Sequence, residues 1–401
     1  MKKKYRIKKK PVIILMLSTI IVVVLLCFAF SSKYKIIIDN IEVNDSNIIN
    51  YKITYKNEDI SNKCKLESVI DNKIIGKQKV IFLCDKVKVK GNVNVIDNKA
   101  PVLSLNGGDM VKIAQNSAYE EYGYTVIDNY DQKISVKITG KVDTKVIGTY
   151  ELKYSSVDSS NNKAEKIRKV IVTDKSPLNM SLKNFTLDGY FENVKPKESE
   201  EQDSDYIKQF IYVGDSVPLY YVITEHIGGN RLWHKEGLSL AQVFTQEIYI
   251  AHQKSGLTLV QAFEKYKPKA VIINLGMNSV SSMTSKYFIG EYAKLIKKIK
   301  EVSPNTVIAI NSIPPVAKSY DDNKYNLNNE KINEFNYYIL EMCAKLNIYY
   351  LDSASVLKDS NGQCKEGYYL DKEEPTRAHQ TVAGNNAVFE YFKTHKIKLE
   401  G

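Results

Sequence analysis

The pattern of hydrophobic and polar positions divides this 401-residue chain into three unlike parts. Residues 12–30 form an apolar stretch without a charge, which is long enough to cross a bilayer as a helix. From about residue 34 to 174, short runs rich in Ile, Val, Tyr and Thr alternate with polar turns, which is typical of β-strands. After residue 206, apolar runs alternate with helical patterns, so we expect a parallel sheet covered by helices.

The third part, residues 206–397, is therefore predicted to be an α/β domain of the flavodoxin-like, parallel-sheet kind. Its expected strands are 210–213, 270–275, 306–310 and 348–351, and its expected helices are 240–251, 258–266, 287–302, 330–346 and 381–395.

The β-rich part contains a weak internal repeat. A turn, strand, turn and strand occur over residues 71–97 and again over 143–174. This predicts two β-sandwich modules in tandem, 34–96 and 97–174. Residues 175–205 lose the β pattern and become polar and charged, so they are interpreted as a linker.

The net charge of +11 is partly local, because seven Lys or Arg residues lie within the first ten positions. The rest is mildly basic, so no nucleic-acid partner is predicted. A basic segment (1–11) before an apolar one indicates a cytoplasmic N-terminus, a single-pass membrane helix and extracytoplasmic residues 31–401. One alternative is a cleaved signal peptide, but no clean Ala-x-Ala cleavage site follows the apolar stretch. The other is a lipoprotein signal at Cys27, but the residues before Cys27 are Val-Leu-Leu, without the small residue that such a site has.

Cysteine positions leave the pairing open. Cys64 and Cys84 fall in one β module and Cys343 and Cys364 in the last domain, and spacing alone assigns no disulfide. No Cys/His cluster has zinc spacing, and we predict neither a metal nor a cofactor.

Four pieces of the last domain suggest serine chemistry. Ser216 ends the turn Gly214-Asp215-Ser216 directly after an apolar run, although such a tripeptide alone is also ordinary turn chemistry. His379 is the base type that activates a serine near neutral pH. Gly237 and Asn278 would supply a backbone N–H and an amide N–H to an oxyanion.

In this order, Ser216, Gly237, Asn278 and His379 resemble the four blocks of the SGNH, or GDSL-like, hydrolases, over about residues 206–395. The resemblance implies a Ser–His esterase site. Two positions depart from the family pattern: Thr376 stands where the family has Asp, and Ser279 follows Asn278 where Asp is usual. Asp371, Glu374 or Glu373 could be the third catalytic residue in place of that Asp. Alternatively, the site is a Ser–His dyad without a carboxylate.

Residues 97–174 resemble the bacterial Ig-like repeats of surface proteins, on positions that include Pro101, Tyr122-Gly123, Asp128-Asn129, Gly148-Thr149-Tyr150 and Asp158. Such modules act as spacers or weak adhesive domains, so the resemblance implies a stalk.

The combined prediction is a membrane-anchored, outward-facing serine esterase. Its partner would be an acylated cell-wall or surface polysaccharide, from which it removes O-acetyl groups. Two alternatives remain open: O-acyl transfer to the same class of glycan, and an adhesion or scaffold protein whose hydrolase domain has decayed.

Overall fold

The computed structural model describes residues 33–45, 49–174, 187, 189–320, 326–370 and 379–399. The predicted cytoplasmic segment 1–11 and membrane helix 12–30 lie outside this part. Among the helices that are described, none has both the length and the hydrophobicity needed to cross a bilayer. The chain divides into two compact units; the first holds the chain up to Val102 with Val126–Val136 and Ser155–Ala164, and the second holds the remainder.

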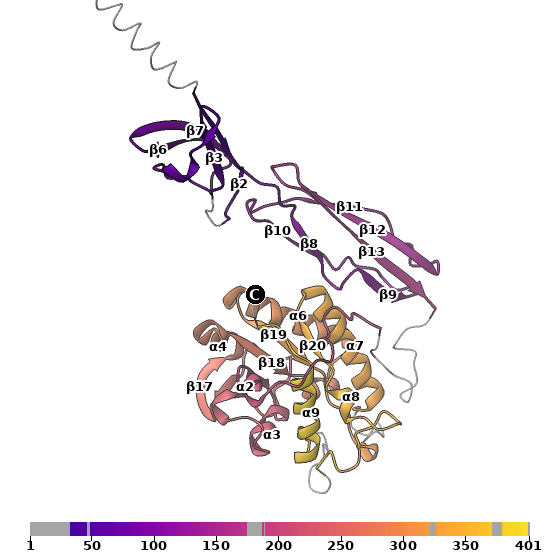
Figure 1. Cartoon of the computed structure of the whole chain (residues 1–401). Coiled ribbons are helices and arrows are strands. Elements are labelled where there is room, and N and C mark those ends of the chain that lie inside the picture. The colour runs from indigo at the N-terminus through magenta and orange to yellow at the C-terminus, as the bar shows by residue number, and fades with distance from the viewer. Residues whose placement is uncertain are drawn as a thin grey trace, which may run out of the picture. The chain divides into compact units, whose positions relative to one another are not determined.

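The N-terminal β module is built from two sheets (Figure 1). Its paired positions Cys64 and Cys84 lie on neighbouring antiparallel strands and are joined by a disulfide. Alternation along the two longest strands buries Val80, Phe82 and Val93 in the core between the sheets. One sheet has the order β1 (Tyr34–Ile38), β3 (Tyr51–Tyr55), β4 (Glu58–Asp59), and the other β2 (Ile41–Glu42), β7 (Val87–Ile96), β6 (Gly76–Cys84), β5 (Cys64–Leu66).

The second module also has two sheets, and a buried arginine organises part of it. The Arg168 side chain is fully buried, donates to the carbonyl oxygens of Asn106 and Gly123, and pairs with Glu121 at 3.1 Å. Burial of this charge is tolerated because its donors are satisfied. The sheets are β10 (Tyr124–Ile127) with β8 (Val102–Leu105), and β11 (Val136–Thr139), β12 (Gly148–Val157), β13 (Lys163–Thr173), β9 (Met110–Ala114) in that order.

The C-terminal domain is centred on a seven-stranded sheet. Five strands are parallel, in the spatial order second, first, third, fourth, fifth of a doubly wound sheet: β15 (Leu232–His234), β14 (Ile211–Gly214), β18 (Ala270–Asn274), β19 (Val307–Asn311) and β20 (Tyr349–Leu351). Beyond β15, the strands β16 (Glu247–Ile250) and β17 (Gln253–Thr258) are antiparallel and extend the edge. The flavodoxin-like prediction therefore holds for the centre of the sheet.

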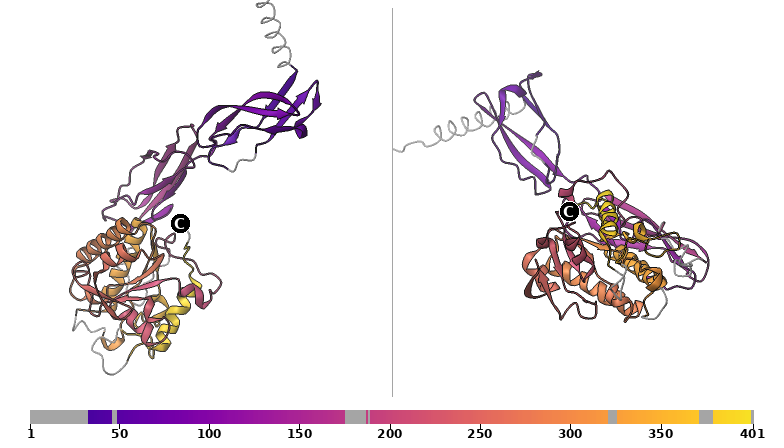
Figure 2. Two further views of the ribbon diagram at one scale, coloured as in Figure 1. Left: turned by 90° about the vertical axis from the view of Figure 1, so that its left-hand side faces the viewer. Right: turned by 90° about the horizontal axis from the view of Figure 1, so that it is seen from below.

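Helices cover both faces of this sheet (Figure 2). On one face, Tyr212 of β14 packs against α3 (Val217–Ile223) and α9 (Val382–Thr394) through the rings of Tyr221 and Phe389. Trp233 of β15 points to the other face and meets Phe263 of α4 (Leu259–Tyr266). The remaining helices are α2 (Ser204–Ile207), α5 (Met277–Val280), α6 (Ser285–Val302), α7 (Asn329–Leu346) and α8 (Ala354–Leu357).

The expected helix 240–251 is wrong. Its buried Leu240 and Val243 have helical spacing, but the chain forms successive turns and then enters β16. The cause lies in the second half of the segment, where Ile248 and Ile250 belong to a strand that pairs with β15. Strands β15 and β17 were not predicted, because β15 has only three residues and β17 is mostly polar.

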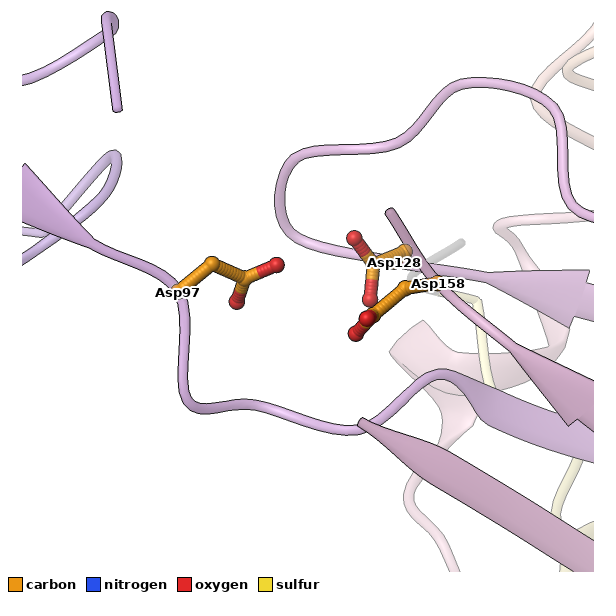
Figure 3. A group of neighbouring side chains, drawn as sticks. All are labelled: Asp97, Asp128 and Asp158. Atoms are coloured by element: carbon orange, nitrogen blue, oxygen red, sulfur yellow. The ribbon is translucent and has the colours of Figure 1, made fainter. Parts of the chain in front are cut away.

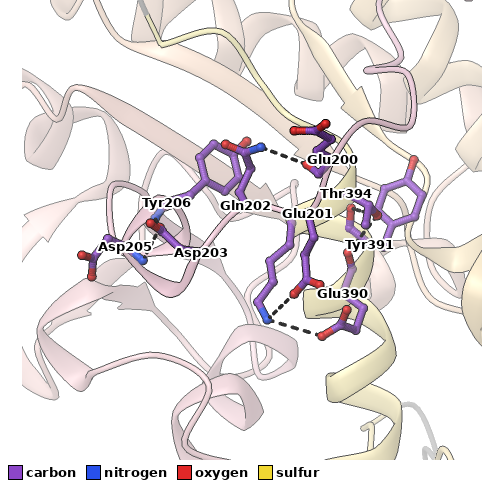
Figure 4. A network of polar contacts seen from close by, with 10 residues as sticks. Glu200, Glu201, Gln202, Asp203, Asp205, Tyr206, Glu390, Tyr391 and Thr394 are labelled. Atoms are coloured by element: carbon purple, nitrogen blue, oxygen red, sulfur yellow. Dashed lines mark hydrogen bonds and ion pairs between the residues drawn. The ribbon is translucent and has the colours of Figure 1, made fainter.

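The described end of the expected linker packs on the C-terminal domain (Figure 4). The Ser199 and Gln202 N–H groups donate to the carbonyl oxygens of Thr394 and Lys393 at the end of α9. Lys393 also pairs with Glu201 at 3.1 Å and Glu390 at 3.4 Å. Residues 199–202 therefore fasten the start of this domain to its last helix.

Candidate active site

The carboxyl edge of the parallel sheet brings three of the predicted residues to one place. Gly214, the last residue of β14, pairs with His234 of β15 on one side and with Asn274 of β18 on the other. Ser216, Gly237 and Asn278 follow these three aligned positions within a few residues. In this doubly wound sheet the switch point, where ligands bind, lies between the carboxyl ends of the neighbouring strands β14 and β18.

The turn at Ser216 depends on a close backbone approach. A Cβ on Gly214 would meet the Asn274 carbonyl and the Pro218 ring at 2.8 Å, so only glycine fits. Ser216 then stands at the N-cap of α3 with helical backbone angles, and its side chain makes no capping bond. The hydroxyl is therefore directed to another partner instead of serving the helix.

That partner is His379. Its Nε2 atom lies 2.9 Å from Ser216 Oγ, although the two residues are 163 positions apart in the chain. The imidazole also stacks on the ring of Tyr220, with centroids 4.2 Å apart and planes 16° from parallel. Backbone bonding from Leu370 N–H to the His379 carbonyl holds the residue just before α9. The Ser–His contact is the geometry that a general base requires.

Asp215 joins the serine turn to Asn278. Its Oδ1 accepts the Val217 N–H at 2.9 Å, and its Oδ2 accepts Asn278 Nδ2 at 2.9 Å. Burial raises the pKa of Asp215 to about 6, against the lowering effect of these two hydrogen bonds. An amide nitrogen carries two N–H groups, so Asn278 has a second donor for a ligand while the first fixes its orientation.

Gly237 lies in the turn after β15 with a φ of 69°, and a Cβ there would meet no atom within 4 Å. Glycine is needed for the left-handed backbone, and the position is open. The departure at Ser279 helps to hold this segment: its buried hydroxyl accepts the Leu240 N–H at 2.9 Å. The segments that carry Gly237 and Asn278 are thus tied together, so Ser279 has a structural use here.

The candidates for a third member fall outside the described residues. Asp371, Glu373, Glu374 and Thr376 all lie in the segment 371–378. Two other histidines have partners of their own: His226 contacts Thr224 and Asn386, and His395 stacks on Tyr391.

Sequence reasoning missed two contributors to this site. Tyr220, which stacks on the His379 ring, lies one helical turn beyond Ser216, and that spacing was the available signal. A buried polar chain runs beneath the serine turn: Asn274 Oδ1 accepts Tyr221 OH at 3.2 Å and Asn311 Nδ2 at 3.0 Å, and Asn311 Oδ1 accepts Ser353 Oγ at 2.7 Å. Polar residues at the ends of consecutive strands were its signal.

Comparison with known proteins agrees with the two resemblances. Residues 103–172 match the model for a bacterial surface protein Ig-like domain, and residues 213–387 match the GDSL-like lipase/acylhydrolase family. No curated protein matches the chain.

Three solved structures illustrate the likeness of the C-terminal domain. A GDSL-like lipase from Bacteroides thetaiotaomicron is 15% identical, with 48% of this chain and 88% of that chain covered and a TM-score of 0.34. The OSK domain of Drosophila Oskar is 16% identical, with 47% and 90% covered and a TM-score of 0.33. A peptidoglycan O-acetylesterase is 12% identical, with 39% and 42% covered and a TM-score of 0.30. At these values the likenesses say nothing about activity.

Proposed function

We propose that the C-terminal domain, whose residues 213–387 match a GDSL-like acylhydrolase family, is a serine esterase that uses Ser216 as nucleophile and His379 as general base. The observation that carries the proposal is the 2.9 Å contact between Ser216 Oγ and His379 Nε2. The Ser216 hydroxyl does not cap α3 but contacts an imidazole, which is the arrangement needed for proton transfer.

The reaction follows from these atoms. Ser216 Oγ attacks the ester carbonyl while its proton passes to His379 Nε2, and the resulting oxyanion is met by N–H groups of Ser216, Gly237 and Asn278. Collapse of the tetrahedral intermediate breaks the acyl C–O bond, and the imidazolium returns the proton to the leaving alcohol. Water then attacks the acyl-serine by the same route and releases the acid. Asp215 positions Asn278 and takes no proton in this scheme.

Tyr220 supports His379 in a different way. Its stacked ring limits rotation of the imidazole about its side-chain bonds, which keeps Nε2 on the serine. This support comes from a helix that begins at the nucleophile itself, so serine and histidine are positioned by one element.

For the substrate we propose an O-acetyl group on a cell-wall or surface glycan. The support is indirect: the Ig-like match at residues 103–172 is to bacterial surface proteins, and the sequence of residues 1–30 has the pattern of a basic segment followed by a membrane anchor. In this proposal the chain faces outward from a membrane, with the β modules as a stalk.

The first test is labelling of the full-length protein with a fluorophosphonate, which transfers its phosphonyl group to an activated serine with loss of fluoride. We expect label on Ser216 by peptide mass, and hydrolysis of p-nitrophenyl acetate that falls at least about a thousandfold in Ser216→Ala. Ser355→Ala is the matched control, because this exposed hydroxyl only bonds the Asp352 carbonyl. A folded wild-type protein without label at Ser216 would refute the esterase proposal and favour a scaffold role.

Acyl transfer to a glycan is the second candidate, because it passes through the same acyl-serine. The exposed position of Gly237 leaves the site open to an acceptor on that side. Turnover of the acetate ester that depends on added oligosaccharide, with slow hydrolysis in its absence, would favour transfer over hydrolysis.

A further inference from the structure

We propose that Asp97, Asp128 and Asp158 form a calcium site in the β part of the chain, independent of the esterase site. All three belong to the same compact unit. Each aspartate comes directly after a strand, since β7 ends at Ile96, β10 at Ile127 and β12 at Val157. Three strand ends thus present a carboxylate at the same place.

The carboxylates converge, as Figure 3 shows: the Asp97 side chain points toward those of Asp128 and Asp158. One oxygen atom from each residue lies within 4.8 Å of those of the other two. Two ligands on opposite sides of Ca²⁺, each about 2.3–2.6 Å from the ion, are about this far apart. The spacing therefore suits three ligands around one such ion.

Hydrogen bonds within the loops use only part of the capacity of these carboxylates. Asp97 Oδ1 accepts Lys99 N–H at 3.2 Å, and Asp128 Oδ1 accepts the N–H groups of Tyr130 and Asp131. The Oδ2 atoms of Asp97 and Asp128 are buried and have no hydrogen-bond partner. Both oxygens of Asp158 accept hydrogen bonds, Oδ1 from the N–H groups of Ser160 and Asn162 and Oδ2 from Asn162 Nδ2 at 2.8 Å. Asp97 is only 5% exposed, so water cannot solvate this charge freely. An unpartnered buried carboxylate oxygen is costly unless a cation meets it.

Nearby positive charge does not meet that need. Lys99, two residues after Asp97, forms its ion pair with Asp45 at 3.7 Å. Among the described residues, none of the Lys and Arg ion pairs includes a member of the aspartate cluster. Asn129, next to Asp128, has a buried side-chain oxygen that also lacks a partner. The unpartnered side-chain atoms of Asp97, Asp128 and Asn129 are therefore all oxygen atoms that could bind a metal ion.

The donor set selects the ion. Carboxylate and amide oxygens without Cys or His suit a hard cation and disfavour zinc. Magnesium would need shorter bonds and near-octahedral geometry, whereas calcium accepts more ligands in looser arrangements. Cys and His spacing predicted no metal, and these aspartates are far apart in the chain. Bound calcium would fasten the segments after β7, β10 and β12 to one another.

The test titrates the full-length protein, kept in mild detergent and stripped with EDTA, with CaCl₂ by calorimetry. We expect one site with a Kd of about 10⁻⁴ to 10⁻³ M, the range of extracellular modules, and binding of MgCl₂ at least about tenfold weaker. Asp97→Asn should weaken calcium binding at least about tenfold. Asp71→Asn is the matched control, because Asp71 Oδ1 accepts a turn N–H from Lys73 at 3.0 Å in the same compact unit but is exposed and outside the cluster.

Thermal unfolding separates a metal ligand from a merely structural residue. In EDTA, Asp97→Asn should melt no lower than wild type, because it removes one of three converging negative charges; in about 5 mM CaCl₂ it should melt lower. Equal loss in both buffers, calcium binding as tight as in wild type, or no binding of calcium by wild type up to about 10 mM would overturn the proposal. Esterase activity is not its readout, so either proposal can fail without the other.

Discussion

The buried carboxyl of Asp215 gives the sharpest quantitative prediction, through Asp215→Asn. The side chain is 1% exposed, and burial raises its pKa from 3.8 to about 6. At about 1.4 kcal/mol for each pH unit, this difference corresponds to about 3 kcal/mol. Asparagine keeps the oxygen that accepts the Val217 N–H and carries no charge, so it avoids this penalty.

The sign follows from proton binding. Between pH 3.8 and 6 the folded protein holds the Asp215 proton more tightly than the unfolded chain does. Stability from this group is therefore full at low pH and is lost as the pH rises through 6. We expect the free energy of unfolding of Asp215→Asn, minus that of wild type, to grow by about 2.4 kcal/mol from pH 4 to pH 7.5, because the carboxyl of the unfolded chain is already more than half ionised at pH 4.

Urea unfolding followed by tryptophan fluorescence is the assay, because Trp233 is the single tryptophan and lies buried in β15 beside β14. Asp359→Asn is the matched control: its Oδ1 also accepts turn N–H groups, from Asn361 and Gln363, but the residue is only half-buried. A difference that stays constant across this pH range, or that shrinks as the pH rises, would refute the reasoning. Esterase activity should nevertheless fall. In wild type Asn278 Nδ2 donates a hydrogen bond to Asp215 Oδ2, whereas in the variant it would face the amide nitrogen of the new asparagine, which accepts no hydrogen bond.

Three further predictions test the supports of the site and of the N-terminal β module. Gly237→Ala keeps the backbone N–H but strains a turn whose φ is 69°, so it should lower kcat and cost about 1 kcal/mol of unfolding free energy in the same fluorescence assay; no loss of stability would contradict the need for glycine at this turn. Ser279→Ala leaves the Leu240 N–H unbonded and should cost about 1–3 kcal/mol by urea unfolding, whereas no loss would mean that the bond contributes nothing. Replacing Cys64 and Cys84 together by Ala opens a loop of sequence separation 20 and should cost about 3 kcal/mol by calorimetry of the β module, with esterase activity retained. Loss of that activity would contradict the independence of the two parts.

Hydrophobic patterning predicted much of the C-terminal domain. The strands at 210–213, 270–275, 306–310 and 348–351 occur close to the expected positions, because each is a mostly apolar run between turns. The failure at 240–251 has a tertiary cause: the second half of the segment pairs with β15 as strand β16 instead of forming a helix. Local spacing does not show which segments will pair in a sheet.

The candidate site was likewise predicted only in part from the sequence. Residue types and their order predicted Ser216, Gly237, Asn278 and His379 as site residues, because each lies beside a strand end or a helix start that the pattern marks. The stacked Tyr220 ring, the Asp215–Asn278 bond and the aspartates after β7, β10 and β12 were not identified as partners. Each depends on which strand ends the sheets bring together.

By itself, then, the sequence determined the order of the parts and the chemical types at the turns, since periodicity and turn residues act over short distances along the chain. Only the tertiary structure decided that the His379 ring meets the Ser216 hydroxyl and that Asp97 converges with two distant aspartates. The physical reason is that such contacts follow from sheet order and register, which are fixed by the packing of the whole domain and not by any local run of residues.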